Sequence, residues 1–389
     1  MQGWEILAFP LKQIFSKKRH SVFSILKQVG NPNKHNHFPE SVFSAGSVPM
    51  LTIDTLEKAN VSPGLAQFTL SSFLDHQDAL KEFGKGVSLF SGLKNFKCFS
   101  TVQDHMFTVP EGYNDKHSVG VWCKSGKAKL DVEAFLQVQS VMKPTCYQAL
   151  CDSDVNPNST IKRIRKSTDR TLDFLDQIME KKENYDSLKS VPIFGAIEGG
   201  WNKEERIRSA KETNARNVFG FTIEGFSAPG ANFEQIDLSV VKDLMRTTIQ
   251  ELPECKPRVL NGSWNIKNLL EAIDCGIDIF DSSYASNLAE NNRAIKADFV
   301  DYNLKVEIID LAERKFANDL SILSDHCDCY CCKMKFTAAY ISHLINTKEI
   351  LAQILLVIHN LHNYLKLFET IRHHLRNGTF HSFKEAYLK

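Results

Sequence analysis

The sequence has almost no excess of charge of either sign. Its 47 lysines and arginines are matched by 46 aspartates and glutamates, for a formal net charge of +1. Without a global basic field, any contact with nucleic acid has to come from local patches. The sequence also lacks low-complexity tracts and long internal repeats, and 43% of its residues are apolar. We therefore expect a folded globular protein with a large core rather than a disordered chain.

Long hydrophobic runs are missing as well. The N-terminus has no uninterrupted apolar segment of the signal-peptide type, and the longest apolar run of the C-terminal part, 350–358, is far shorter than the roughly 20 residues that a transmembrane helix needs. We expect no transmembrane segment and a reducing compartment. Thiols stay reduced there, so a tight cysteine cluster favours metal binding over disulfides.

From about residue 118, short apolar runs alternate with amphipathic stretches. Six runs are expected to be strands: 118–122, 146–150, 191–197, 218–223, 258–262 and 277–281. Five segments between them have helical spacing: 131–143, 160–183, 203–215, 234–250 and 265–275. Repeated strand and helix is typical of a parallel α/β fold. Polar residues and glycines at the strand ends favour a (β/α)8 barrel, with a doubly wound sheet as the alternative.

The chain divides into two expected parts. Residues 1–315 form the barrel, whose first 117 residues are irregular, with candidate strands at 41–46, 87–91 and 96–100. Residues 316–389 have a nearly continuous helical pattern behind a cysteine cluster, and we expect them to form an appended, mostly helical subdomain that binds zinc.

The cluster Cys-Asp-Cys-Tyr-Cys-Cys at 327–332 holds four of the ten cysteines. Cys327, Cys329 and Cys332 are spaced so that three thiolates can converge from one loop. Three sulfurs and one imidazole make a closed tetrahedral set that suits one structural zinc ion. Cys331 is an alternative to Cys332 as the third thiolate. A vicinal disulfide between those two is disfavoured by strain.

The fourth ligand is open on spacing alone. Three histidines follow the cluster: His343, His359 and His362. On a helical wheel, His362 lies nearest the centre of the apolar face of 351–365, and His359 lies at its edge. The pattern does not choose between them.

Several motifs together resemble the tRNA-guanine transglycosylases, also called queuine tRNA-ribosyltransferases. They are the cysteine cluster with the downstream His359-Asn360 pair, and upstream the segments 194–200, 258–262 and 276–281. The resemblance covers roughly residues 118–389. It implies a (β/α)8 barrel with a zinc-bearing subdomain, and it implies that His359 is the fourth ligand beside Cys327, Cys329 and Cys332.

The resemblance also implies a chemistry. In that family a carboxylate attacks the ribose of the wobble guanosine at position 34 of tRNAs with GUN anticodons, and queuine replaces guanine. Asp281 matches the nucleophile and Asp152 the aspartate that reads the base edge. Glu198 replaces the usual glutamine before the paired glycines Gly199 and Gly200, so these residues are expected to be the remnant of a base pocket.

This sequence departs from the pattern of the catalytic members. The Asp-Ser-Gly-Gly segment that carries their acid/base is absent, the base-binding loop is replaced at 224–230, and an arginine is missing from 284–287. Losing acid/base help costs a factor of roughly 10²–10⁴ in rate. These losses resemble the non-catalytic accessory subunit of the eukaryotic enzyme. The alternatives are an active enzyme that uses Asp281, or a zinc-stabilised RNA-binding scaffold.

The accessory reading implies two partners, a catalytic subunit in a heterodimer and tRNA. Arg372, Arg376 and Lys384, in the last helical segments, are candidate phosphate contacts. We expect a cytoplasmic protein. The basic segment 1–20, with one acidic residue, leaves open a peripheral association with the mitochondrial outer membrane.

Overall fold

The computed structural model describes residues 41–43, 50–58, 64–105, 110–226, 238–299 and 305–388. The basic segment 1–20 and the first residues of the expected helix at 234–250 lie outside these ranges.

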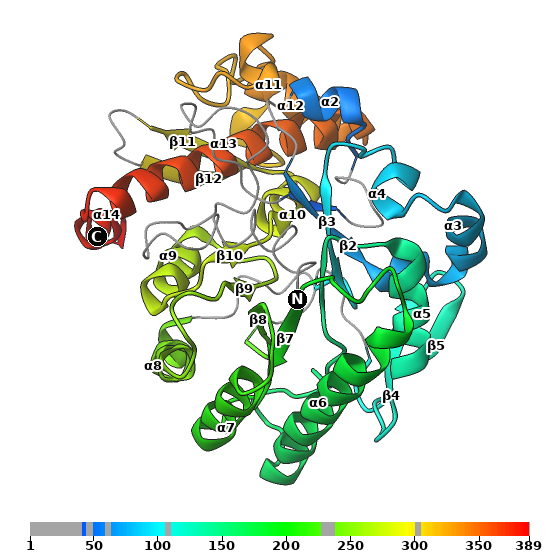
Figure 1. The fold of residues 1–389 in the computed structure, drawn as a ribbon. Helices are drawn as coiled ribbons and strands as arrows, with labels where there is room; N and C mark the ends of the chain where they lie inside the picture. The colour runs from blue at the N-terminus through cyan, green and yellow to red at the C-terminus, as the bar shows by residue number, and fades with distance from the viewer. Residues whose placement is uncertain are drawn as a thin grey trace.

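An eight-stranded, fully parallel sheet forms the centre of the molecule (Figure 1). Its strands are β1 (Ser41–Phe43), β2 (Leu65–Thr69), β3 (Lys97–Thr101), β6 (Cys146–Gln148), β7 (Ile193–Ile197), β8 (Gly220–Ile223), β9 (Arg258–Leu260) and β10 (Ile279–Phe280). They pair in sequence order, without the reversal that a doubly wound sheet requires. Among the described residues, no pairing joins β10 to β1. The expected parallel α/β class is confirmed.

Helices cover the outside of the sheet (Figure 1). They are α3 (Gln77–Phe83), α5 (Val132–Met142), α6 (Ile161–Lys181), α7 (Lys203–Asn214), α8 (Leu238–Gln250) and α9 (Ile266–Cys275), with α10 (Ser283–Glu290) after the last strand. Four of them begin at a side-chain cap, in which Asp131, Thr160, Asn202 or Asn265 accepts a hydrogen bond from the backbone N–H three residues on. Such caps satisfy N–H groups that the helix leaves unpaired. They explain why the sequence places these boundaries well.

The first third of the chain differs from expectation at three places. The run at 118–122 is a strand, but it is β4 (Ser118–Cys123), which pairs antiparallel with β5 (Gly126–Asp131) outside the central sheet. The run at 87–91 is helical, as α4 (Val87–Phe90), and Gly86 at φ +84° precedes it as N-cap. The unexpected strand is β2, whose buried Gln67 interrupts the apolar pattern.

The C-terminal part is mostly helical, as expected. It contains α11 (Tyr330–Lys333), α12 (Ala338–Asn346), α13 (Ile350–Arg376) and α14 (Phe380–Leu388). An antiparallel hairpin, β11 (Arg293–Asp298) and β12 (Lys305–Asp310), precedes them. Short helical segments complete the described fold: α2 (Ile53–Lys58), Leu70–His76, Lys182–Asn184 and Arg314–Phe316.

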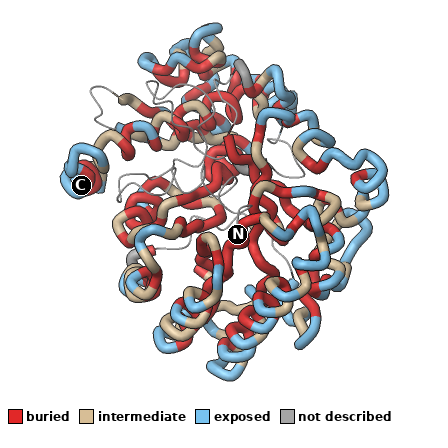
Figure 2. Tube along the Cα trace, viewed as in Figure 1, coloured by how far each residue is buried: buried red, intermediate tan, exposed pale blue. Residues whose placement is uncertain are grey.

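Burial follows the central sheet and the length of α13 (Figure 2). All five residues of β7 are buried, as expected of a parallel strand covered on both faces. Helix α13 is buried on most of its circumference, where it packs on α10 and β11. Within the part of the chain that the structure describes, no helix is both long and apolar enough to cross a membrane.

Candidate metal centre and the carboxyl edge of the sheet

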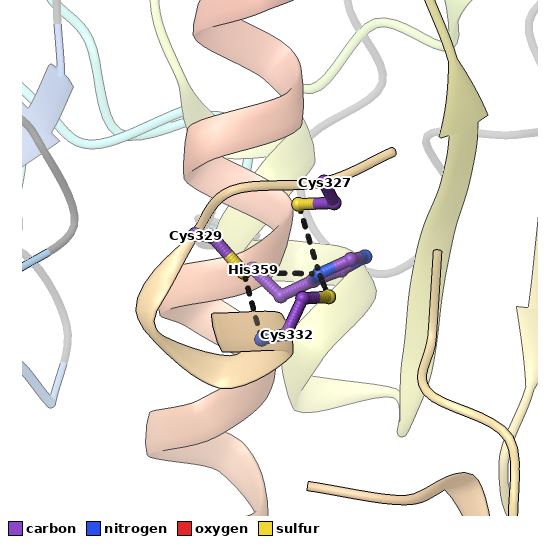
Figure 3. Close-up of side chains that lie close together, drawn as sticks. All are labelled: Cys327, Cys329, Cys332 and His359. Carbon is purple, nitrogen blue, oxygen red and sulfur yellow. Dashed lines mark hydrogen bonds between the residues drawn. The ribbon is translucent and has the colours of Figure 1, made fainter. Parts of the chain in front are cut away.

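Three cysteines and one histidine converge beside α13 (Figure 3). Cys327 lies in the loop before α11, Cys329 is the N-cap of that helix, Cys332 lies within it, and His359 comes from the middle of α13. All four side chains are buried, and their ligand atoms lie within 4.8 Å of one another. The Cys329 sulfur also accepts a hydrogen bond from the backbone N–H of Cys332 at 3.4 Å, which folds the loop around the thiols.

The spacing between these atoms fits a tetrahedral ion. The His359 Nδ1 atom lies 3.8 Å from the Cys327 sulfur and 3.4 Å from the sulfurs of Cys329 and Cys332. Bond lengths of about 2.3 Å to sulfur and about 2.0 Å to nitrogen, at the tetrahedral angle, place sulfur and nitrogen about 3.5 Å apart. The cluster can therefore hold a metal ion.

A second layer of hydrogen bonds orients the imidazole. The other ring nitrogen of His359, Nε2, lies 2.9 Å from the backbone oxygen of Ile295 in β11. Donation to that carbonyl places the ring proton on Nε2 and leaves the Nδ1 lone pair toward the sulfurs. Asn363, one turn further along α13, donates to the Cys327 sulfur at 3.4 Å. Metal-binding histidines characteristically donate their second ring N–H to a carbonyl or carboxylate oxygen, as His359 does to Ile295.

Asn360 ties the same strand to α13. Its side-chain oxygen accepts from the backbone N–H of Ile295 at 2.8 Å, and its amide donates to the backbone oxygen of Arg293 at 2.9 Å. Consecutive residues of α13, His359 and Asn360, thus hold both backbone polar groups of Ile295. The His-Asn pair of the sequence has a structural reason.

The alternative ligands lie elsewhere. Cys331 is fully buried but is not part of the cluster, and burial raises the pKa of its thiol well above the ordinary value. His343 is exposed on α12. His362 has its Nε2 atom 2.8 Å from a carboxylate oxygen of Asp328. The structure thus brings together the set that the family resemblance implied.

Asp281, the position matching the family nucleophile, follows β10 at the carboxyl edge of the sheet. Its two oxygens accept from the backbone N–H groups of Gly262 at 2.5 Å and Ser283 at 3.0 Å, and burial raises the pKa of the carboxyl to about 6. The Tyr364 hydroxyl of α13 donates to the backbone oxygen of Asp281 at 3.0 Å. The helix that carries His359 therefore also fixes the loop that contains Asp281.

Asp152, the position matching the base reader, is fully engaged. Its carboxylate receives two hydrogen bonds from Arg163, at 2.9 and 2.6 Å, one from Arg170 at 2.9 Å and one from Asn114 at 2.7 Å. The side chain is 0% exposed. A base edge could reach this carboxylate only after these contacts break.

Glu198, Gly199 and Gly200 follow β7. Ser153 donates to Glu198 at 2.7 Å, while burial and then the charge of Glu224 raise the pKa of Glu198 to about 8. Gly199 has φ +123°, and a Cβ there would lie 2.7 Å from the backbone nitrogen of Arg206. This close approach requires glycine.

The Arg206 side chain fills the space beside the two glycines. Its guanidinium donates to the backbone oxygens of Gly200, Ile197 and Glu224 and lies 4.0 Å from the ring of Phe226. Arg206 belongs to the part of the sequence that resembles the family, but its burial is not visible in the sequence, because an exposed and a buried arginine look alike in a helical pattern.

The three predicted phosphate contacts differ in exposure, and two of them are buried. Arg372 is buried at 1% exposure, and Lys384 at 2% lies 2.9 Å from Asp274 and 3.5 Å from Glu271 of α9. Both positions argue against contact with a tRNA phosphate, because neither charge reaches the surface. Arg376, at the end of α13, is exposed.

Comparison with known proteins identifies the family of this chain. The family described as queuine tRNA-ribosyltransferase matches residues 36–389. A protein named queuine tRNA-ribosyltransferase accessory subunit 2 from Ixodes scapularis is 37% identical over 343 residues, covering 84% of this chain and 86% of that protein. A protein of the same name from Homo sapiens is 34% identical over 375 residues, covering 87% and 89%. The resemblance drawn from the sequence is confirmed, and the chain belongs to the queuine tRNA-ribosyltransferase family.

Proposed function

We propose that this chain is a non-catalytic accessory subunit that pairs with a catalytic queuine tRNA-ribosyltransferase and supports the exchange of guanine for queuine in tRNA. The names of its relatives support the role. The observation that carries it is the state of Asp152: a carboxylate expected to read a base is instead closed by Arg163 and Arg170 of the same chain. Together with the missing acid/base segment, this leaves the chemistry to the partner.

Asp281→Asn in this chain tests the non-catalytic role. We expect base exchange by the reconstituted heterodimer to stay within roughly twofold of wild type, because under this proposal the partner supplies the nucleophile and Asp281 here only accepts backbone hydrogen bonds from Gly262 and Ser283. The measurement is incorporation of labelled guanine into a cognate tRNA. The same change at the matching aspartate of the catalytic subunit is the control and should abolish exchange. Exchange by this chain alone, lost in Asp281→Asn, would contradict the proposal.

The surface for the catalytic subunit is proposed to lie on the helical C-terminal part. Phe336 and Tyr340 stack with ring centroids 5.8 Å apart, and Tyr340 is 40% exposed. Leu320, 79% exposed, lies beside them, because the backbone oxygens of Asp319 and Ser321 accept from α12. Exposed apolar side chains gathered at one place are a feature of protein interfaces.

Leu320→Glu and Tyr340→Glu should therefore weaken the heterodimer. A buried charge without a partner opposes docking, so each change should lower affinity by about tenfold or more. Affinity for the catalytic subunit can be measured by titration calorimetry. Ile161→Glu provides a matched control, since Ile161 is also exposed but begins α6, away from α12 (Figure 1). Equal loss in all three variants would refute this location.

The same proposal extends to the metal, the barrel, the compartment and the contact with tRNA. The metal is proposed to be one structural zinc ion per chain, since three thiolates and an imidazole leave no open position for water. The parallel sheet is proposed to close into a (β/α)8 barrel over residues 1–315, with 316–389 as the metal-binding subdomain. The chain is proposed to work in the cytoplasm, where thiols stay reduced, and to contact tRNA through exposed groups such as Arg376.

A further inference from the structure

His105 is a side chain at the carboxyl edge of the sheet that the proposed function does not use. It lies four residues after the end of β3, and its side chain is 18% exposed. Its Nε2 atom lies 3.1 Å from a carboxylate oxygen of Glu224, which follows β8. These residues are 119 positions apart in sequence, so only the folded sheet brings them together.

The other Glu224 oxygen is also occupied. Gln148, the last residue of β6, donates to it from Nε2 at 2.8 Å. Glu224 is 4% exposed, so its charge depends on these two partners rather than on water. Side chains from two other strand ends, those of β3 and β6, thus close the carboxylate that follows β8.

The charge of the imidazole follows from its surroundings. Burial lowers the pKa of His105, but the Glu224 carboxylate at hydrogen-bond distance, with smaller contributions from Asp281 and Asp104, raises it to about 9. The same imidazolium holds the pKa of Glu224 below its ordinary value against the effect of burial. The raised pKa of His105 and the lowered pKa of Glu224 both favour an ion pair between them at neutral pH.

We propose that the imidazolium of His105 is a resident counterion that seals the carboxyl edge of the sheet, and that a small planar cation takes its place when the ring is removed. The inference deepens the proposed non-catalytic role by naming a group that keeps this edge closed. Its test reads the ring and the carboxylate directly and needs no partner subunit.

His105→Ala in the full, metal-loaded chain provides the first test. The variant should unfold at a lower temperature than wild type, because Glu224 is left as a buried charge. Imidazole at a pH where it is protonated should restore most of the lost midpoint, since a ligand that binds only the folded state stabilises it. Pyrazole, which has the same shape but is neutral at that pH, should restore little. Wild type and His117→Ala, a change at an exposed histidine, should not respond to imidazole.

The double variant His105→Ala, Glu224→Gln should lose the imidazole response. Metal content, measured after each scan, shows whether imidazole has instead acted at the cysteine cluster. An equal response to imidazole and pyrazole, or no response in His105→Ala, would overturn the counterion while leaving the accessory role untouched. Base exchange by the isolated chain would instead overturn the accessory role.

Nitrogen-edited spectra of the wild-type imidazole rings keep the inference testable if His105→Ala does not fold. The His105 ring should remain protonated through neutral pH, with a pKa near 9 set by Glu224, Asp281 and Asp104. A ring that titrates near the ordinary histidine value would show that it is not the counterion of Glu224.

Discussion

Replacing Cys329 with serine is expected to cost the chain its metal and with it the fold of the C-terminal part. Cys329 is 0% exposed, its sulfur is one of the four converging ligand atoms, and it also caps α11. Binding of structural zinc contributes on the order of 10 kcal/mol to folding, which is comparable with the about 5–15 kcal/mol that stabilises a typical domain. Metal per chain, measured by elemental analysis, should fall from one equivalent to near zero. Helical circular dichroism should decrease with it.

Cys331→Ser is the matched control. Cys331 lies two residues away and is equally buried, but it is not in the cluster. Its replacement by serine is the same chemical change. It should retain the metal and lose only the modest stability of a buried thiol replaced by a hydroxyl, about 1–3 kcal/mol. If Cys329→Ser kept a full equivalent of metal, or if Cys331→Ser lost it, the assignment of Cys327, Cys329, Cys332 and His359 would be wrong.

The effect should reach beyond the metal. Helix α13 carries three residues that connect it to its surroundings. His359 belongs to the cluster, Asn360 accepts from the backbone of β11, and the Tyr364 hydroxyl donates to the backbone of Asp281. Loss of the ion should therefore loosen the carboxyl edge of the sheet as well as α11. Hydrogen exchange in Cys329→Ser should increase at Ile295, whose amide donates to Asn360, and at Ser283, whose amide donates to the carboxylate of Asp281.

The cysteine half of the metal centre is readable from sequence because it is local. Cysteines at 327, 329 and 332 fall within one short loop and one turn of helix, so their spacing alone nearly fixes their geometry. The histidine is different. Helix α13 is buried on most of its circumference, including Leu361, Asn363 and Tyr364, so it has no single apolar face on which a wheel could rank His359 against His362. The wheel placed His362 nearer the centre of the apolar face, and only the family resemblance pointed to His359, the histidine in the cluster.

The edge of the sheet was less predictable for another reason. Strand β2 was missed because Gln67 is buried within it, where its amide donates to Thr101 of β3 at 2.9 Å. Polar residues inside the sheet break the apolar runs by which strands are recognised. His105 and Glu224 carried no signal at all, because their contact exists only once distant strand ends meet. Sequence periodicity predicts helices and strands, whereas contacts such as that between His105 and Glu224 depend on how the strands are arranged.

Asp152→Ala is the second change with a large expected effect. Removing the carboxylate leaves two guanidinium groups, of Arg163 and Arg170, facing each other at 26% and 20% side-chain exposure. Breaking a buried ion pair by removing one partner typically costs about 3–5 kcal/mol, because the remaining charge is uncompensated. Urea unfolding should show a lower midpoint at an unchanged slope, the mark of a change in stability alone.

Asp169→Ala supplies the comparison that gives this result its meaning. Asp169 also pairs with an arginine, Arg208 at 2.8 Å, but it is 63% exposed, and an exposed pair contributes only about 0–1 kcal/mol. A carboxylate kept available for a base would behave more like Asp169, since it would have few protein partners to lose. A cost for Asp152→Ala as small as that of Asp169→Ala would mean that the arginines leave Asp152 accessible. A large cost would mean that this position serves the fold, and that a base could bind there only at the expense of the ion pairs that hold α6 to the segment after β6.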